Sequence, residues 1–292
     1  MQVNLVMLII FCAVLGLNVL FFLLSLNKYN DYIEPLNEKD FKLKKFMPMA
    51  FFILDTIKYK YSSKYDRDLL TKIAEIYGAK YSYYYLQVHW ANKITFVLLA
   101  LVFLALFGVS GKPDIGFGVF ALIVIVVIIY VTDNELNEKI KKRRLSIQMD
   151  FPDFLNKLIL LINAGMTVPR AWEKVVADNK KNRVLYEELS LVVADVRGGK
   201  SEINAYEDFA KRCRIPEITK FISVVLQNMR KGNAELVSIL RLQAGESWEM
   251  RKHAAKRLGE EAATKMLLPM MIMFLAVLII VATPAVMAMQ GI

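Results

Sequence analysis

The 292-residue chain is poor in the side chains that bind metals and form disulfides, with only two cysteines and two histidines. Cys12 lies inside an apolar run and Cys213 in a charged segment, which argues against a disulfide framework or a thiolate metal cluster. His89 and His253 are too few for a histidine-rich metal site, and their interfacial and polar surroundings favour structural roles. We therefore expect no bound metal.

Nucleotide-binding and catalytic motifs are also lacking. Neither a GxxxxGK[ST] phosphate loop nor a GxGxxG fingerprint occurs, and Gly116 and Gly118 are explained by helix geometry at the mouth of an apolar run. His253 with Glu249 resembles the phospho-acceptor helix of a sensor kinase, but no ATP-binding module follows it. The sequence thus predicts a protein that is not an enzyme, with no catalytic residue and no cofactor.

Asp, Glu, Lys, Arg and His are absent from four apolar runs, residues 3–26, 94–109, 115–131 and 266–289. As a helix the first run crosses about 30 Å of hydrocarbon, and the second and third runs are shorter and indicate a tight hairpin, so we expect about four transmembrane helices. The first run lacks a basic n-region and a small-x-small cleavage site, which favours an uncleaved anchor over a signal peptide. The absence of charge inside the runs argues against an ion-coupled transporter.

Basic residues are segregated along the chain. Of the 38 lysines and arginines, 12 lie in residues 27–93, 25 lie in residues 132–265, and Lys112 alone lies in the hairpin between the second and third runs. The positive-inside tendency places both long segments in the cytoplasm and both termini outside. The expected order in the cell membrane is a first transmembrane helix (1–26), a cytoplasmic loop (27–93), a transmembrane hairpin (94–131), a cytoplasmic domain (132–265) and a C-terminal transmembrane helix (266–292).

The first cytoplasmic loop contains a short Met- and Phe-rich stretch, residues 46–57, that follows Lys42, Lys44 and Lys45. The stretch is too short to span a bilayer comfortably. It predicts either an interfacial helix at headgroup level, with its lysines facing anionic lipid, or a core helix of a small cytoplasmic unit.

The second charged segment shows helical periodicity throughout. Asp150 with Pro152 predicts a helix start, and further helices are expected to begin near residues 167, 185, 201, 216 and 233. Turns are expected at Gly165, Gly198, Gly199 and Gly232. Short connections predict an antiparallel six-helix bundle, so the expected fold class is all-α, a polytopic membrane protein with a helical cytoplasmic domain.

Two basic clusters are candidate contact surfaces. The first follows the third run directly, where a role in membrane topology and in contacts with anionic lipid explains it better than nucleic-acid binding does. The other alternates with glutamates at spacings near i,i+4, which favours a solvated, self-paired face, with a surface for an acidic partner as the alternative. The first cluster contains Lys139, Lys141, Lys142, Arg143 and Arg144, and the second contains Arg251, Lys252, Lys256 and Arg257.

Several stretches resemble the cytoplasmic domain and exit helix of the type II secretion F-protein family. They are DFPDFLNKLILLINAGMTVPRAWEKV, the helix before Gly198 and Gly199, AYEDFAKRCRIPEITKFISVVLQNMRKGNAELVSILRLQA, and EMRKHAAKRLGEEAATKMLLPMM. The stretch DLLTKIAEIYGAK before the second run looks like the N-terminal segment of the Tad, or Flp pilus, branch. The resemblance fits both TadB-like and TadC-like members of that branch. Residues 68–79 also match residues 153–164 weakly, as in a degenerate repeat.

This resemblance implies a membrane platform protein of a pilus or secretion machine. Its expected partners are a hexameric secretion ATPase, a second F-type platform protein, pilin or pseudopilin subunits and anionic lipid, in a homo- or hetero-oligomer and without nucleic acid. Longer F proteins carry two full bundle domains, whereas this sequence has one, which favours the Tad-like branch. A membrane-anchored signalling receptor or a small transporter is the alternative.

Overall fold

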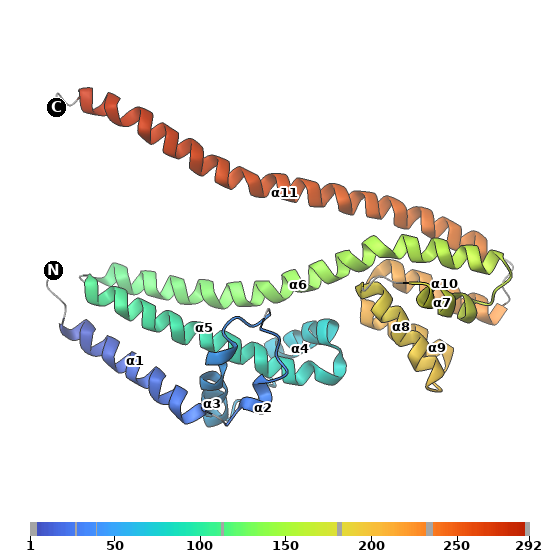
Figure 1. The fold of residues 1–292 in the computed structure, drawn as a ribbon, viewed down its shortest axis with the longest axis horizontal. Helices are drawn as coiled ribbons and strands as arrows, with labels where there is room; N and C mark the ends of the chain where they lie inside the picture. Colours follow the sequence, from blue (N-terminus) through green and yellow to red (C-terminus); the bar gives the residue numbers. More distant parts are fainter. Residues whose placement is uncertain are drawn as a thin grey trace. The chain divides into compact units, whose positions relative to one another are not determined.

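The computed structural model describes residues 5–26, 28–38, 40–111, 114–179, 183–231 and 236–289. Every regular element within these ranges is helical, and four helices are long and apolar enough to cross a membrane, which confirms the all-α prediction. The chain divides into two compact units, Met1–Arg143 and Arg144–Ile292. Helix α6 (Ile115–Asn163) runs through the boundary between them without interruption (Figure 1).

The first unit is built around the long helices α1 (Leu5–Ser25), α5 (Ser82–Ser110) and the first part of α6. Helix α1 packs against α5. Gly108 of α5 permits a close approach, because a Cβ atom there would lie 2.8 Å from Met7 Cε of α1 and 3.3 Å from Phe117 Cε1 of α6. A glycine thus stands where three of these apolar helices meet.

Five short helices complete the first unit. They are α2 (Asn30–Ile33), the 3-10 helix η1 (Lys44–Phe46), α3 (Met47–Ile57), α4 (Lys64–Tyr77) and the 3-10 helix η2 (Ala79–Tyr81). Helix α3 buries Met47, Ala50, Phe51 and Leu54 in a cluster with Val88 of α5 and packs against both α1 and α5. The Met- and Phe-rich stretch therefore lies mainly in the interior of this unit.

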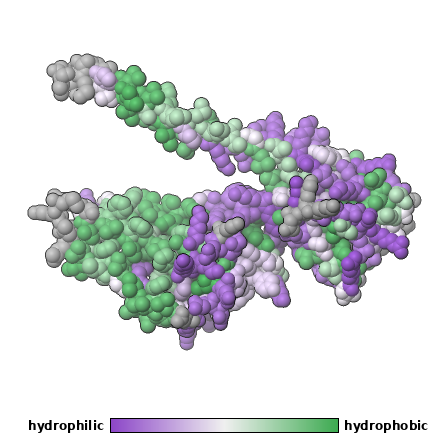
Figure 2. Space-filling model, in the orientation of Figure 1, coloured by the Kyte–Doolittle hydropathy of each residue, from purple (hydrophilic) through white to green (hydrophobic). Residues whose placement is uncertain are grey.

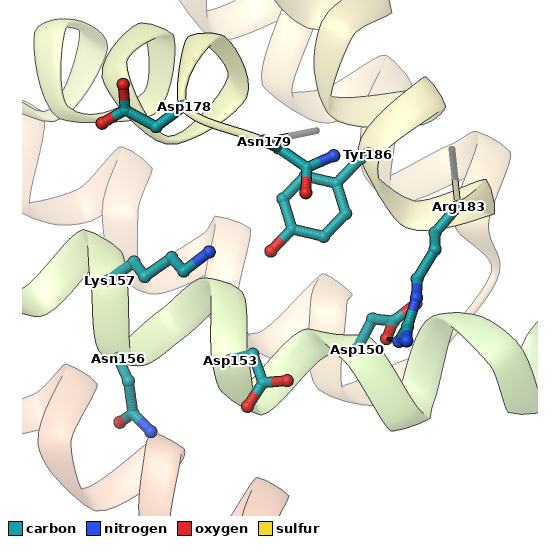
Figure 3. A pocket seen from close by; sticks show the side chains of 8 residues that line it. All are labelled: Asp150, Asp153, Asn156, Lys157, Asp178, Asn179, Arg183 and Tyr186. Carbon is teal, nitrogen blue, oxygen red and sulfur yellow. Dashed lines mark hydrogen bonds and ion pairs between the residues drawn. The ribbon is translucent and has the colours of Figure 1, made fainter. Parts of the chain in front are cut away.

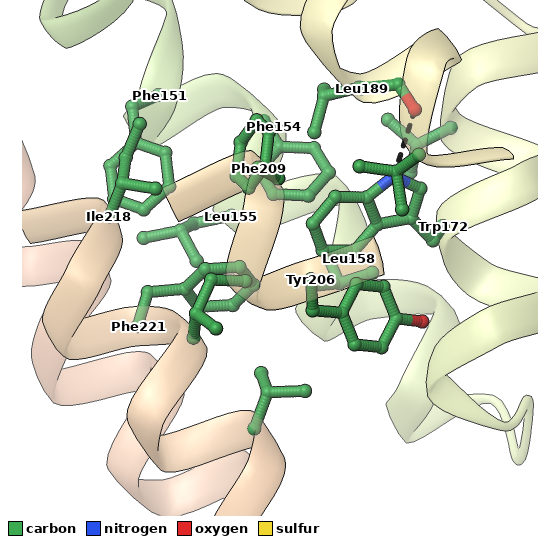
Figure 4. Packing of buried hydrophobic residues seen from close by; sticks show 14 of the residues in the cluster. Phe151, Phe154, Leu155, Leu158, Trp172, Leu189, Tyr206, Phe209, Ile218 and Phe221 are labelled. Atoms are coloured by element: carbon green, nitrogen blue, oxygen red, sulfur yellow. Dashed lines mark hydrogen bonds between the residues drawn. The ribbon is translucent and has the colours of Figure 1, made fainter. Parts of the chain in front are cut away.

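The second unit, here called the helical domain, is formed by the end of α6 and five further helices. These are α7 (Val168–Ala177), α8 (Val184–Arg197), α9 (Glu202–Cys213), α10 (Pro216–Lys231) and α11 (Leu236–Met289). All six contribute to one hydrophobic core. Figure 4 shows side chains of this core from α6 to α10. Trp172 stands at its centre, with its ring 5.0 Å from Phe154, 4.9 Å from Tyr206 and 5.4 Å from Phe209.

The helix start predicted at Asp150 and Pro152 is wrong, because α6 continues from the third apolar run through Pro152 to Asn163. Proline lacks an N–H group, so the Gln148 carbonyl loses its usual intrahelical donor, at a cost of about 3 kcal/mol in a typical helix interior. The apolar stripe that includes Phe154 and Leu158 is fully buried in the core. Burial of such side chains stabilises by about 1.5–3 kcal/mol each, which is enough to keep the helix continuous.

The predicted turns are glycines that end helices. Gly165 has φ +90° and follows α6, and Gly199 has φ +92° and follows α8 with Gly198 beside it. A left-handed conformation of this kind closes a helix and costs side chains with a Cβ atom about 1–2 kcal/mol. Gly232 lies outside the described residues.

Hydrophobic surface covers the long helices of the first unit and the C-terminal part of α11 (Figure 2). The short helices of the first unit and the helical domain carry mostly hydrophilic surface in the same view. Exposed Leu and Ile side chains in α1 and in the last part of α11 are expected where a helix faces lipid rather than water.

Candidate functional site

A partly buried polar cluster joins α4, α5 and α6 next to the apolar hairpin. Its centre is Asp133 of α6, whose Oδ1 atom lies 2.7 Å from the Tyr65 hydroxyl, 2.6 Å from Lys93 Nζ and 3.1 Å from His89 Nε2. The Lys93 side chain is only 6% exposed, so Asp133 supplies the counter-charge that a buried ammonium group requires. We call these four residues the Asp133 cluster.

Sequence reasoning missed the Asp133 cluster, although a signal was present. Lys93 directly precedes the second apolar run, Asp133 follows the third, and each stands 20 positions from Pro113 in the hairpin loop. Two antiparallel helices of equal length bring such positions to the same level. The geometry of the hairpin could therefore have indicated the pair.

A second carboxylate, Asp66, holds the start of α4. Asp66 is 1% exposed and accepts hydrogen bonds from Trp90 Nε1 at 2.8 Å, the Ser63 hydroxyl at 2.8 Å and the Tyr59 hydroxyl at 3.0 Å. Burial alone would raise the pKa of Asp66, but these hydrogen bonds outweigh it and lower the pKa below its ordinary value. Ser63 and Asp66 also form a reciprocal capping box, so one carboxylate both caps α4 and ties it to α5.

The first basic cluster is divided by the structure. Lys139 Nζ lies 3.4 Å from Asp40 Oδ1 and 3.4 Å from Glu135 Oε1, so this lysine links α6 to the loop between α2 and η1. Lys141 pairs with Glu138 at 2.9 Å along α6. The remaining members are Lys142 and Arg144, which are exposed, and Arg143, which is half-buried.

The second basic cluster separates into two groups. Three members form pairs along α11, Lys252 with Glu249 at 3.8 Å, Lys256 with Glu260 at 3.9 Å and Arg257 with Glu261 at 3.7 Å.

Arg251 behaves differently from these three. Its Nη1 atom lies 3.0 Å from Asp153 Oδ1 of α6, and its guanidinium group lies 4.7 Å from the Trp248 ring centroid. Arg251 thus joins the two helices that enter the helical domain.

A polar groove of about 540 Å³ lies on the helical domain between the end of α6, the end of α7 and the start of α8 (Figure 3). Arg183 pairs with the buried carboxylate of Asp150, and Lys157 Nζ lies 5.8 Å from the Tyr186 ring centroid. The lining residues are Asp150, Asp153, Asn156, Lys157, Asp178, Asn179, Arg183 and Tyr186.

The chemistry of this polar groove is that of a contact surface. It offers carboxylates, amides, a lysine and an arginine, which can hydrogen-bond and pair with a partner's charged side chains. Within the part of the chain that the structure describes, no group of three or more His, Cys, Asp or Glu residues is arranged to hold a metal ion. The groove therefore fits a protein segment of mixed charge.

Ion pairs rigidify the domain beside this groove. Arg212 Nε of α9 lies 2.7 Å from Glu188 Oε2 of α8, and Glu188 is mostly buried. Lys200 Nζ lies 2.6 Å from Asp208 Oδ2 and 3.2 Å from Asp195 Oδ2. The hydrogen bond from Lys200 lowers the pKa of Asp208, and the two ion pairs of Lys200 connect the residue before the N-cap of α9 to α8 and α9.

Residues 154–284 match the family model of the type II secretion system (T2SS) protein F. The matched segment starts in the last turns of α6, contains α7 to α10 and ends within the apolar part of α11. Most of the polar groove and the second basic cluster lie inside it. No curated protein and no solved structure matches the chain significantly.

Proposed function

Because the chain belongs, through residues 154–284, to the family of the type II secretion system protein F, we propose that it is the non-enzymatic platform of a pilus or secretion machine in the cell membrane. In this role it couples a cytoplasmic secretion ATPase to the assembly or export of pilin subunits. The stretch DLLTKIAEIYGAK before α5 supports the Tad, or Flp-type, branch of that family.

One observation carries this proposal: both helices that leave the helical domain also contain a predicted membrane span. Helix α6 has 49 residues and α11 has 54, so at 1.5 Å per residue they measure roughly 74 Å and 81 Å. Each helix holds buried residues of the domain core at one end and an apolar run at the other. A tilt or rotation of the domain would therefore reach the spans without a loop to absorb it.

The Arg251–Asp153 pair supports joint movement of these two helices. It connects them beside the core, where Lys220 of α10 also pairs with Glu246 of α11 at 2.7 Å. The domain core lies between the same elements and is packed around Trp172. Such an arrangement suits a rigid lever better than a ligand-binding module.

The polar groove is the surface that we assign to the ATPase. Asp178 and Lys157 are exposed at the groove and carry opposite charges. Asp178 pairs with Lys174 at 3.1 Å along α7, and because this pair is exposed to solvent a cationic side chain of the partner can replace it. Neither Asp178 nor Lys157 contributes to the hydrophobic core. Charge reversal at these positions therefore changes the contact surface and leaves the fold intact.

The test uses the full-length chain in lipid nanodiscs together with the ATPase encoded beside it. We expect micromolar or tighter binding and a rise in ATP hydrolysis on addition of the nanodiscs. Asp178→Lys and Lys157→Glu should each weaken binding about tenfold, as expected for a charge in a docking surface. Glu207→Lys serves as the matched control, because Glu207 is an equally exposed carboxylate on α9 outside the groove.

Two outcomes would contradict the proposal. One is the absence of any association between the full-length chain and the ATPase in both nanodiscs and detergent. The other is normal fibre formation or secretion in cells that lack this chain. If binding persists but all three charge reversals behave alike, the ATPase contacts another surface and the assignment of the polar groove fails.

A further inference from the structure

A corner formed by residues 41–46 lies against the end of α1 that leads into the short helices. Phe46, at the end of η1, has its ring centroid 6.1 Å from that of Phe22 in α1. Phe52 of α3 makes a similar contact with Phe21, at 6.0 Å. Phe46 is nevertheless 41% exposed, so much of its ring has no protein neighbour.

The contact with Phe22 fixes the depth of this corner relative to the predicted span. The apolar span of α1 is Val6–Ser25, and Phe22 stands three residues before its end. At 1.5 Å per residue, Phe22 lies roughly 5 Å inside the hydrocarbon boundary. The headgroup layer adds roughly 5–8 Å on each side of the hydrocarbon, so a side chain that contacts Phe22 lies at the junction between acyl chains and headgroups.

The three lysines of the corner have different roles. Lys44 Nζ donates hydrogen bonds to the carbonyl oxygens of Leu36 at 2.6 Å and Glu34 at 3.1 Å, so it fastens the corner to the loop after α2. Lys42 and Lys45 are exposed, and neither forms an ion pair or hydrogen bond with another described residue. Two cationic side chains are thus available on either side of a held lysine, next to an exposed aromatic ring.

We propose that this corner is a binding site for anionic phospholipid headgroups. Lys42 and Lys45 pair with the lipid phosphates, and Phe46 inserts at the acyl boundary of the same leaflet. An aliphatic lysine stem can extend along apolar surface while its ammonium group reaches the headgroups. The bilayer is the favoured occupant because the corner is continuous with the apolar surface of α1, which itself faces lipid.

This site differs from the interfacial helix that the sequence allowed. Helix α3 is mostly buried between α1 and α5, and only the residues that lead into it remain open to lipid. The headgroup contact would hold the junction between α1 and α3 at a fixed depth. It concerns the membrane alone and is independent of ATPase binding.

Site-specific quenching can test the proposal in the full-length chain. Phe46→Cys in a Cys12→Ser background accepts a thiol-reactive fluorophore, whereas Cys213 is fully buried and should escape labelling. The labelled protein is reconstituted in nanodiscs that contain brominated phosphatidylglycerol or brominated phosphatidylcholine. We expect quenching in both, and stronger quenching by the anionic lipid.

Removal of the two charges should abolish this lipid preference. Near an anionic surface each lysine corresponds to roughly a fivefold change in lipid association, so Lys42→Gln with Lys45→Gln should lower the preference by roughly 25-fold at the site. Lys174→Gln with Lys211→Gln removes two exposed lysines of the helical domain and should leave it unchanged. Lys44 is retained throughout, and circular dichroism checks the fold.

Each contrary result overturns the proposal. Equal quenching by the two lipids in the labelled protein that retains Lys42 and Lys45 would show that the corner has no preference for anionic headgroups. If the preference for anionic lipid survives the Lys42 and Lys45 substitutions, other basic residues cause it. An absence of quenching by either lipid would place Phe46 away from the acyl boundary.

Discussion

Substitution of Asp133 by asparagine should destabilise the first unit more than any exposed charge substitution. The change keeps the size of the side chain and an oxygen that can accept from Tyr65, but it removes the negative charge 2.6 Å from Lys93 Nζ. Lys93 is 6% exposed and would be left without a counter-charge. A buried ammonium group in that state is costly because neither water nor a partner stabilises it.

The expected loss is about 2–4 kcal/mol in the free energy of unfolding. Removal of one partner from a buried ion pair typically costs about 3–5 kcal/mol, and the estimate is reduced because the Asp133 side chain is 27% exposed and partly screened by solvent. Lys93→Met combined with Asp133→Asn removes both charges and should recover most of the loss, and the single Lys93→Met variant completes the double-mutant cycle. The double-mutant cycle should therefore give a coupling energy of about 1.5–3 kcal/mol.

Unfolding of the purified chain in detergent micelles with increasing SDS, followed by circular dichroism, measures these differences. Glu260→Gln is the control, since Glu260 and Lys256 are 66% and 75% exposed and their pair should contribute less than about 0.5 kcal/mol. A loss below about 1 kcal/mol for Asp133→Asn would refute the reasoning. So would a double variant that is less stable than either single variant.

Three further perturbations should change stability through different mechanisms. Trp172→Ala should lower the free energy of unfolding by about 3–5 kcal/mol in the same assay, because the side chain is 1% exposed and its N–H donates to the Leu189 carbonyl at 3.3 Å. Trp172→Phe should lower it by less, because it keeps an aromatic ring in the core. Gly165→Ala should cost about 1–2 kcal/mol, because φ there is +90°, and a variant as stable as the wild type would contradict that strain. For Asp66, whose pKa is lowered in the fold, the carboxylate stabilises the protein above about pH 4, and this stabilisation is lost as the pH falls through the folded pKa. The difference in unfolding free energy between wild type and Asp66→Asn should therefore shrink between pH 6 and pH 3, and a constant difference would count against the assigned hydrogen bonds.

Local signals predicted several helix ends correctly. The helix expected before Gly198 and Gly199 is α8, which ends at Arg197, and the one expected at Pro216 is α10. Ser201 caps α9 by accepting from the Asn204 N–H group. These features act within a single turn, so the neighbouring residues suffice to specify them.

Pro152 shows where local signals fail. A proline at the first turn of a helix and a proline inside a longer helix have the same immediate neighbours, so Asp150 with Pro152 was compatible with either. Whether the helix starts at Asp150 or continues through Pro152 depends on burial of Phe154 and its neighbours in a core that α7, α9 and α10 complete. That core makes α6 continuous, and the continuity of α6 is the basis of the proposed function.

The sequence by itself determined the all-α class, the four apolar helices and the basic character of the segments between them. These properties follow from runs of adjacent residues, because hydrocarbon length and helix periodicity are read along the chain. Only the tertiary structure decided that Lys93 meets Asp133, that α3 lies inside the first unit and that Lys42 and Lys45 stay exposed while Lys44 is held. Ion pairing and burial depend on which segments pack together, so residues that are distant in the sequence, such as Lys93 and Asp133, acquire those relations only in the folded chain.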